Sequence, residues 1–110
     1  MTQDDFTYCL ILITVGAEEE GAKIANALLT EKLAACINIA PINSFYSWQG
    51  KIHQDREWQL LIKTRFNLFE QLAERVKSLH SYDVPEIIAL PIVAGSKPYL
   101  NWISDNTQFL

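Results

Sequence analysis

Four side chains able to do chemistry lie close together in the last third of the sequence. An imidazole, a phenol and two carboxylates fall within seven residues, as His80, Tyr82, Asp83 and Glu86. A helix-like pattern ends just before this segment, and an apolar, strand-like run begins just after it. Because loops at the ends of regular elements carry binding chemistry more often than cores do, this junction is the first candidate site.

Metal binding is the first chemistry that these residue types suggest. Cys36 and His80 are the softest metal ligands of the chain, and they suit copper or zinc. Glu57 and Glu86 would add oxygen ligands. Neither Cys36 nor His80 has a second cysteine or histidine at ligand spacing, and thiols in strands or histidines at helix ends commonly have structural roles. A site for copper or another divalent ion and an inert role therefore both stay open.

A cleft for a small molecule is the second chemistry. Glu57 and Lys63 lie an even number of residues apart on a predicted strand, so their side chains share one face. They would pair with each other or with a ligand, and Lys63 would meet the negative group of an anionic or zwitterionic molecule. Polar groups beside aromatic ones describe a ligand pocket, and four more residues are predicted to shape it: Trp48, Tyr82, Glu86 and Trp102. The alternative is a network of ion pairs between subunits.

Catalysis is the third chemistry, and the sequence favours it least. His80 with Asp83 or Glu86 would form a general acid–base pair. The chain has no G-x-S-x-G, P-loop or H-E-x-x-H motif to accompany such a pair. We therefore expect a protein that is not an enzyme.

The first half of the chain predicts the elements that position these groups. Residues 6–15 form an apolar run typical of a central strand, and Gly16 then allows a turn. Residues 18–32 keep helical spacing, and the three glutamates that begin them suit the first turn of a helix better than a catalytic acid cluster. Two extended runs, 35–48 and 51–64, then form a long hairpin.

Details of the hairpin and of the second half complete the pattern. Gln49-Gly50 is a tight turn, and Pro41 indicates a bulge or an edge strand. Residues 67–79 form a second helix, in which Asn67 and Glu70 resemble a capping box and which His80 ends. The remaining elements are a strand, apolar on both faces, at 87–93 and a short helix that begins at Ser96 and Pro98.

The order of elements predicts the fold class. A βαββαβ order with an added C-terminal helix indicates an α+β, ferredoxin-like sandwich, in which two helices cover one face of an antiparallel sheet. We expect residues 1–110 to form one domain. The first and last strands are apolar on both faces, so the uncovered sheet face would expose a large apolar patch to water. We therefore predict an oligomer held together by that face.

Composition limits the binding partners and the cellular compartment that we expect for the protein. The net charge is -4 and the nine basic residues are scattered, which argues against nucleic acid as a partner; the aromatic strand motif of the RNA-recognition fold is also absent. Cys9 and Cys36 are predicted to be buried free thiols, as in a reducing compartment. The acidic segment Met1–Asp5 lacks the positive region of a secretory signal, and the apolar run Cys9–Ile13 is too short to cross a membrane. We expect a cytoplasmic protein without a membrane partner.

Five segments carry a resemblance to a known family. They are residues 33–39 (LAACINI), 44–52 (SFYSWQGKI), 57–64 (EWQLLIKT), 80–88 (HSYDVPEII) and 99–103 (YLNWI). In this order they resemble the CutA family of divalent-cation tolerance proteins. The resemblance implies a ferredoxin-like fold in a tight homotrimer, similar in architecture to the trimeric PII signalling proteins, which bind small ligands in clefts between subunits.

The resemblance also sets the functional expectation. It implies a non-catalytic protein that is linked to divalent-ion tolerance and requires no cofactor. The protein would bind copper or another divalent ion, and Cys36 or His80 would donate the ligand atom. The alternative is a PII-like signalling module that binds a small molecule in its inter-subunit clefts. Three positions depart from the family pattern: Ser47 stands where an aromatic is usual, Ser81 where proline is usual, and Asp83 where glutamate is usual.

Overall fold

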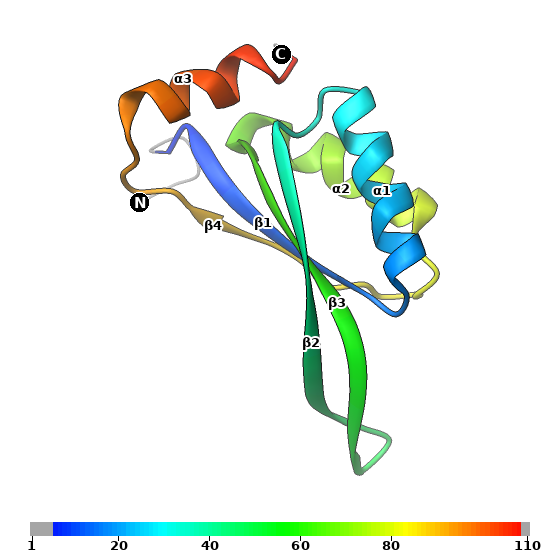
Figure 1. The fold of residues 1–110 in the computed structure, drawn as a ribbon. Helices are drawn as coiled ribbons and strands as arrows, with labels where there is room; N and C mark the ends of the chain where they lie inside the picture. Colours follow the sequence, from blue (N-terminus) through cyan, green and yellow to red (C-terminus); the bar gives the residue numbers. More distant parts are fainter. Residues whose placement is uncertain (1–5, 109–110) are drawn as a thin grey trace.

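The computed structural model describes residues 6–108, so the acidic segment 1–5 considered above lies outside the described residues. Four strands form one antiparallel sheet in the order β2-β3-β1-β4 (Figure 1). The elements in chain order are β1 (Tyr8–Val15), α1 (Glu18–Thr30), β2 (Cys36–Trp48), β3 (Lys51–Arg65), the 3-10 turn η2 (Phe66–Leu68), α2 (Phe69–Leu79), β4 (Ile87–Pro91) and α3 (Lys97–Asp105). The predicted βαββαβ order with an extra C-terminal helix is confirmed.

The central position predicted for the first strand is also confirmed. β1 lies between β3 and β4, and α1 and α2 lie together on one face of the sheet (Figure 1). Alternate residues of β1 are fully buried under these helices, as at Cys9, Ile11 and Ile13, because successive strand side chains point to opposite faces. On the other face, the described residues place a helix at one end only, where α3 packs against Tyr8 and Arg65.

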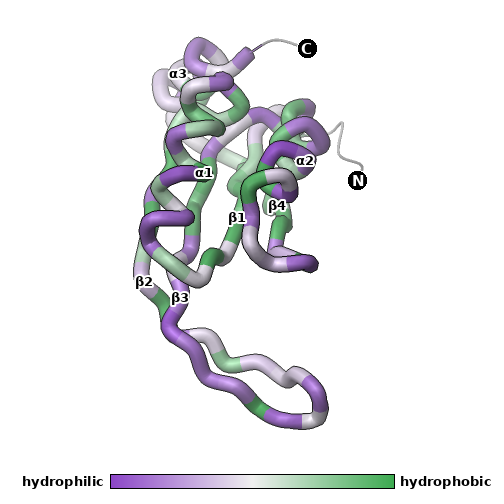
Figure 2. Tube along the Cα trace, turned by 90° about the vertical axis from the view of Figure 1, so that its right-hand side faces the viewer, coloured by the Kyte–Doolittle hydropathy of each residue, from purple (hydrophilic) through white to green (hydrophobic). Residues whose placement is uncertain are grey.

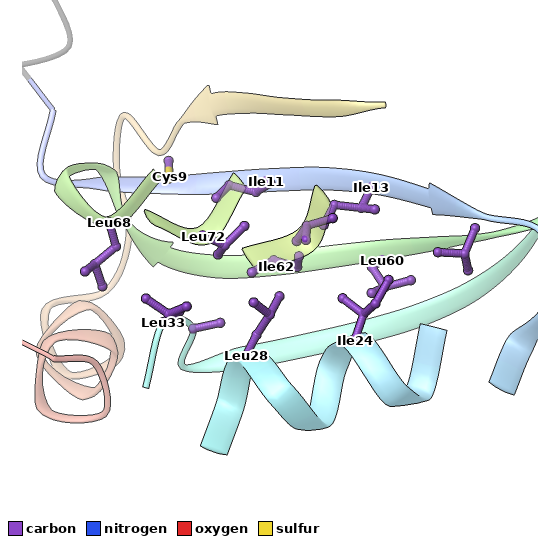
Figure 3. Close-up of a cluster of buried hydrophobic side chains, with 13 residues drawn as sticks. Cys9, Ile11, Ile13, Ile24, Leu28, Leu33, Leu60, Ile62, Leu68 and Leu72 are labelled. Carbon is purple, nitrogen blue, oxygen red and sulfur yellow. The ribbon is translucent and has the colours of Figure 1, made fainter. Parts of the chain in front are cut away.

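The core fills the space between the sheet and the two helices (Figure 3). Strand side chains such as Ile11 and Leu60 meet Ile24 and Leu28 from α1 and Leu72 from α2, and all of them are 0% exposed. Each such side chain contributes about 1.5–3 kcal/mol when it leaves water. This burial fixes the sheet relative to the helices and so fixes every strand end on which the candidate residues lie.

The hairpin of β2 and β3 extends well beyond the helices (Figure 2). Pairing of β1 with β3 ends at Val15 and Trp58, so residues 42–57 form a ladder of two strands only, which we call the arm. Gln49 and Gly50 have φ of 52° and 76°, the positive values that the predicted tight turn requires. Pro41 lies in the edge strand β2 without a bulge in the register.

One local prediction, the capping box, is wrong. Helix α2 begins at Phe69, and its N-cap is Leu68, with no hydrogen bond from a capping side chain. Asn67 lies inside the 3-10 turn η2, which leaves β3 at Arg65 and buries Leu68 completely. The demand for burial of Leu68 overrides the local capping signal. β4 ends at Pro91 rather than at residue 93.

Helix α3 packs against the end of the sheet through both apolar and polar contacts. Ile103 is 0% exposed, and the hydroxyl groups of Tyr8 and Ser104 lie 2.6 Å apart. Arg65, 7% exposed, donates to the Thr107 hydroxyl at 3.0 Å and to the backbone carbonyl of Gln108. No helix within residues 6–108 is long and apolar enough to cross a membrane.

The uncovered sheet face, called the open face below, is apolar as predicted. Leu10, Leu12 and Leu61 are half-buried on it, and Ile88 and Leu90 of β4 are 49% and 42% exposed. These residues alternate with the core residues along the same strands. The open face therefore exposes an apolar patch to water.

Candidate functional site

A pocket of about 1000 Å³ opens at one end of the open face. Its walls come from the strand ends, from the arm and from the loop between α2 and β4. The lining residues are Thr14, Ile42, Ser44, Phe45, Tyr46, Trp48, Glu57, Gln59, Tyr82, Asp83, Val84 and Glu86. The structure brings together in this pocket four of the six residues predicted to form a ligand cleft.

Glu57 and Tyr82 are joined inside this pocket. The Tyr82 hydroxyl donates a 2.7 Å hydrogen bond to Oε2 of Glu57, and Glu57 is only 9% exposed. Burial, followed by the hydrogen bond to Glu57, raises the pKa of Tyr82 above its ordinary value. Tyr82 therefore remains a neutral donor at physiological pH.

Gly16 makes room for this contact. A Cβ at Gly16 would meet the Tyr82 hydroxyl oxygen at 3.0 Å, closer than side chains normally approach. Gly50 is the one glycine with a positive φ among residues 6–108, so Gly16 is required for space rather than for a left-handed backbone. The turn predicted at Gly16 thus also leaves room for Tyr82, which lines the pocket.

Two more carboxylates line the pocket. Glu86 accepts a 3.2 Å hydrogen bond from the Thr14 hydroxyl through Oε2, whereas Asp83 makes no hydrogen bond or ion pair with residues 6–108. Among the residues that the structure describes, no lysine, arginine or histidine lines the pocket. The pocket is therefore acidic as well as aromatic.

His80 lies behind Tyr82, and its side chain is 0% exposed. The backbone N–H of Tyr82 donates to Nδ1 of His80 at 3.0 Å, so Nδ1 must be unprotonated. The proton then resides on Nε2, which donates to the backbone carbonyl of Thr14 at 2.8 Å. Because both ring nitrogens are engaged within the chain, His80 fixes the loop and offers no free lone pair to a metal.

Glu20 is the carboxylate beside His80, at 3.4 Å from Nδ1. It accepts hydrogen bonds from the backbone N–H of Ser81 at 2.9 Å and from the Ser81 hydroxyl at 2.9 and 3.1 Å. The predicted pairing of His80 with Asp83 or Glu86 is wrong, since those carboxylates point to the pocket instead. Ser81, where the family resemblance expects proline, supplies an N–H that proline lacks.

The opposite end of the open face holds a different group of residues. Cys36 and Lys63 are partners across β2 and β3, and Trp102 of α3 stacks on Tyr99 with ring centroids 5.6 Å apart. Burial, followed by the neighbouring Cys36 thiol, raises the pKa of Tyr99. Cys36 was expected to be buried and is partly exposed; Cys9 is buried as expected, and burial raises its pKa to about 12.

Glu57 and Lys63 do lie on the same face of β3, as predicted, but they do not pair. They are six residues apart on the strand, roughly 20 Å at about 3.3 Å per residue. Lys63 instead donates to the side-chain oxygen of Asn38. Within one chain, Lys63 and Trp102 therefore lie outside the pocket that holds the other four predicted residues: Trp48, Glu57, Tyr82 and Glu86.

The described residues also show no ready-made metal site. No group of three or more His, Cys, Asp or Glu side chains within residues 6–108 is arranged to hold a metal ion. Cys36 and His80 lie on different faces of the sheet, and His80 has no free nitrogen. Of the two predicted soft ligands, His80 has both nitrogens engaged within the chain, whereas the Cys36 thiol is partly exposed.

Sequence reasoning missed the aromatic cluster of the arm. Tyr46 stacks on His53 with centroids 5.5 Å apart, and Trp48 meets the same ring edge-on at 5.7 Å. The Tyr46 hydroxyl donates to Asp55, a bond that raises the pKa of Tyr46. The register set by the Gln49-Gly50 turn places Tyr46 opposite His53, and that register was the signal available in the sequence.

Comparisons with known proteins agree with one another. The family described as "CutA1 divalent ion tolerance protein" matches residues 9–106. The "Divalent-cation tolerance protein CutA" of Thermus thermophilus is 52% identical over 99 residues, 89% of this chain and 96% of the relative. "Protein CutA, chloroplastic" of Arabidopsis thaliana is 51% identical over 100 residues, and the matched part covers 90% of this chain but 55% of the relative. The structure of the "Periplasmic divalent cation tolerance protein CutA" from Archaeoglobus fulgidus has a TM-score of 0.90 and 44% identity, with 92% of this chain and 99% of that chain covered.

Proposed function

The chain belongs to the CutA1 family of divalent ion tolerance proteins, and on that premise we propose that it acts without catalysis, as a homotrimer that binds copper or another divalent ion. The family is named for an ion tolerance and not for a reaction. The single observation that carries the proposal is the open face. Every predicted binding group except His80 lies on it or at its edge, including Cys36, Glu57 and Lys63.

Assembly through the open face is supported by two physical arguments. The half-exposed leucines and isoleucines of that face would stabilise an oligomer by leaving water. The arm adds a second reason, because a two-stranded ladder without a third strand is marginally stable alone in water. A homotrimer, the oligomer that the family resemblance implies, would cover the open face and support the arm.

Metal binding is proposed at Cys36. The thiol is partly exposed on the open face, where copies of the chain would bring their own cysteines and carboxylates near it. Thiolates prefer copper and zinc over hard divalent ions. A single chain lacks the remaining ligands among its described residues, so the site would be completed only in the assembly.

Native mass spectrometry combined with titration of copper and zinc ions tests this function. We expect a trimer, and a saturable site that Cys36→Ser abolishes. Cys9→Ala is the matched control, because Cys9 is buried in the core and should leave metal binding unchanged. A monomer, or a metal stoichiometry unaffected by Cys36→Ser, would contradict the proposal.

A signalling role, similar to that of PII proteins, is the second candidate. It is favoured by the pocket walls, because an arm and a loop that both line one pocket are elements able to change position when a ligand binds. Hydrogen exchange of residues 81–86 with and without ligand distinguishes the two roles. A signalling module should show protection of this loop on binding, whereas a metal-binding trimer should show protection around Cys36.

The cytoplasm is the compartment that we propose. Both cysteines are free, as expected in a reducing environment. Relatives are described as chloroplastic or periplasmic, so the compartment differs within the family. Fractionation of cells that express the full chain tests the proposal, and recovery in a membrane or periplasmic fraction would contradict it.

A further inference from the structure

His80 is a buried histidine that connects parts of the chain far apart in sequence. Its side chain is 0% exposed and lies where the loop between α2 and β4 meets the start of α1 (Figure 1). Its hydrogen bonds to Thr14 and to the backbone of Tyr82 are made within one chain, so they exist whether the open face is covered or not. They therefore belong to the assembled protein as much as to a single chain.

The hydrogen bonds of the His80 ring require its neutral form. Nδ1 accepts from the backbone N–H of Tyr82 at 3.0 Å, and Nε2 donates to the carbonyl of Thr14 at 2.8 Å. A proton added to Nδ1 would face the Tyr82 N–H, which is also a donor. The charged ring therefore loses the bond to Tyr82 and keeps the bond to Thr14.

Glu20 is placed to receive the charged form of the ring. Its Oε2 lies 3.4 Å from Nδ1 of His80, and the backbone N–H and hydroxyl of Ser81 hold both of its carboxylate oxygens. A buried cation is costly without a negative partner, and this carboxylate lies at the nitrogen that would gain the proton. Lys77, the nearest lysine along α2, pairs with Glu74 at 3.6 Å instead.

The titratable groups on the other sides of the ring are acidic. The Tyr82 ring lies beside His80 with centroids 4.8 Å apart, and its hydroxyl donates to Glu57 of β3. On β1, the hydroxyl of Thr14 donates to Glu86, while its carbonyl accepts from the imidazole. Carboxylates from α1, β3 and the start of β4 thus surround the ring, and Glu20 is the one within reach of Nδ1.

We propose that His80 is a proton-sensitive hold on the loop 81–86. The neutral ring accepts the Tyr82 amide and keeps the loop against β1. A proton from solution that binds Nδ1 makes the ring a donor to Glu20, and the Tyr82 amide then loses its acceptor. Because the Tyr82 hydroxyl also holds Glu57, acid would loosen one wall of the pocket. The proposal goes beyond the proposed function, since it needs neither a metal nor a ligand.

Two measurements on the assembled wild-type protein test the proposal. Nitrogen-15 chemical shifts of the imidazole report which ring nitrogen carries a proton, and hydrogen-exchange protection factors, corrected for the intrinsic effect of pH, report the Tyr82 amide. We expect Nδ1 to gain a proton between about pH 8 and pH 5, the range in which histidines change charge. Protection of the Tyr82 amide should fall in parallel by roughly fivefold, the factor for one lost hydrogen bond. Amides of β1 should keep their protection.

A matched pair of histidine variants identifies the ring responsible. His80→Asn keeps an oxygen able to accept near the position of Nδ1 but does not titrate, so protection of the Tyr82 amide should become independent of pH. His53→Asn is the control, because His53 lies on the arm and its ring contacts Tyr46 and Trp48. This control should retain the pH dependence of the wild type.

A charge-removing variant of Glu20 tests the partner of the ring. Glu20→Gln keeps an oxygen that can accept from Ser81, but it withdraws the negative charge from His80. Both the nitrogen-15 transition and the change at the Tyr82 amide should move to lower pH by roughly one unit. A purely structural role for Glu20 would instead loosen the loop equally at every pH. This variant and the wild type carry the test if His80→Asn fails to fold.

Several results would overturn the proposal. A ring that stays neutral at pH 5, or one that gains a proton while the Tyr82 amide keeps its protection, would show that His80 does not control the loop. The same pH dependence in His80→Asn would assign it to another group, and parallel loss of protection throughout β1 would assign it to global unfolding. Failure to form a trimer or to bind metal through Cys36 would refute the proposed function and leave this inference standing.

Discussion

Leu61 and Ile62 are neighbours on β3, and their side chains lie on opposite faces of the sheet. Ile62 is 0% exposed beneath α1 and α2, whereas Leu61 is only half-buried on the open face. The same strand therefore contributes to one face that is complete within a single chain and to another that is not. The covered face accounts for the stability of the fold, and the open face carries the pocket and Cys36.

The largest expected effect follows from replacing Ile62 or Leu61 by alanine. Ile62→Ala should lower the free energy of unfolding by about 2–5 kcal/mol at any protein concentration, because it leaves a cavity in a packed core. Leu61→Ala should cost less, and its cost should shrink as the protein is diluted, because part of its burial comes from assembly. Denaturant titrations at two protein concentrations measure both. A concentration-independent loss at Leu61 would contradict the comparison.

A charge on the open face should affect assembly without unfolding the chain. Leu90→Glu would place an unpaired carboxylate in the proposed interface, at a cost of roughly 1–3 kcal/mol or more per copy, and should yield smaller species in light scattering. Leu29→Glu is the control, because Leu29 is 40% exposed on α1 and Leu90 is 42% exposed on β4. Dissociation by Leu29→Glu, or an intact trimer with Leu90→Glu, would show that the open face is not the interface.

The two cysteines extend the comparison of the covered and open faces to the pH dependence of stability. Burial on the covered face raises the pKa of Cys9 from 9.0 to about 12. The neutral thiol therefore stabilises the fold fully below pH 9, and this contribution is lost as pH rises toward 12, because the unfolded chain releases the proton first. The slope is about 1.4 kcal/mol per pH unit in that window.

Alkaline denaturation of two single variants tests this pH effect. Cys9→Ala should show a flatter loss of stability above pH 9 than the wild type under reducing conditions, whereas Cys36→Ala keeps Cys9 and should retain the steep loss. Identical pH profiles for Cys9→Ala and the wild type would show that the buried thiol does not control the alkaline transition.

The smallest expected effect concerns the loop that connects the two faces. Ser81→Pro removes the backbone N–H and the hydroxyl that bind Glu20, each worth roughly 0.5–1.5 kcal/mol. Ser81→Ala removes only the hydroxyl and should have about half the effect. Faster hydrogen exchange at the Tyr82 amide, which donates to His80, measures the loosening. Unchanged exchange in Ser81→Pro would mean that Glu20 does not hold this loop.

The regular elements were predictable because their signals are local. The apolar run along 6–15, the turn at Gln49-Gly50 and the helical stripe after residue 67 each depend on residues a few positions apart, and all three appear in the fold. The capping box failed because burial of Leu68 decides where α2 begins. The parity of Glu57 and Lys63 correctly gave their common face, but a pair between them was excluded by the strand rise of about 3.3 Å per residue, which holds them roughly 20 Å apart.

The site itself was only partly predictable because its contacts are distant in sequence. His80 binds Thr14, 66 residues away, and Ser81 binds Glu20, 61 residues away. No local pattern marks either partner. The sequence located the junction at 80–86, since a helix end followed by a strand is a local signal. The opposite faces of Cys36 and His80 follow only from the assembled sheet, so local reasoning could not decide between them as metal ligands.

The unbroken run of β3 has a mechanical consequence. It extends from Lys51 at the tip of the arm to Arg65, whose guanidinium binds the carbonyl of Gln108 beyond α3. β3 therefore connects the tip of the arm with the end of the sheet that contacts α3, as one continuous strand. A displacement of the hairpin tip would therefore act, through the same strand, on the contacts that hold the C-terminal helix.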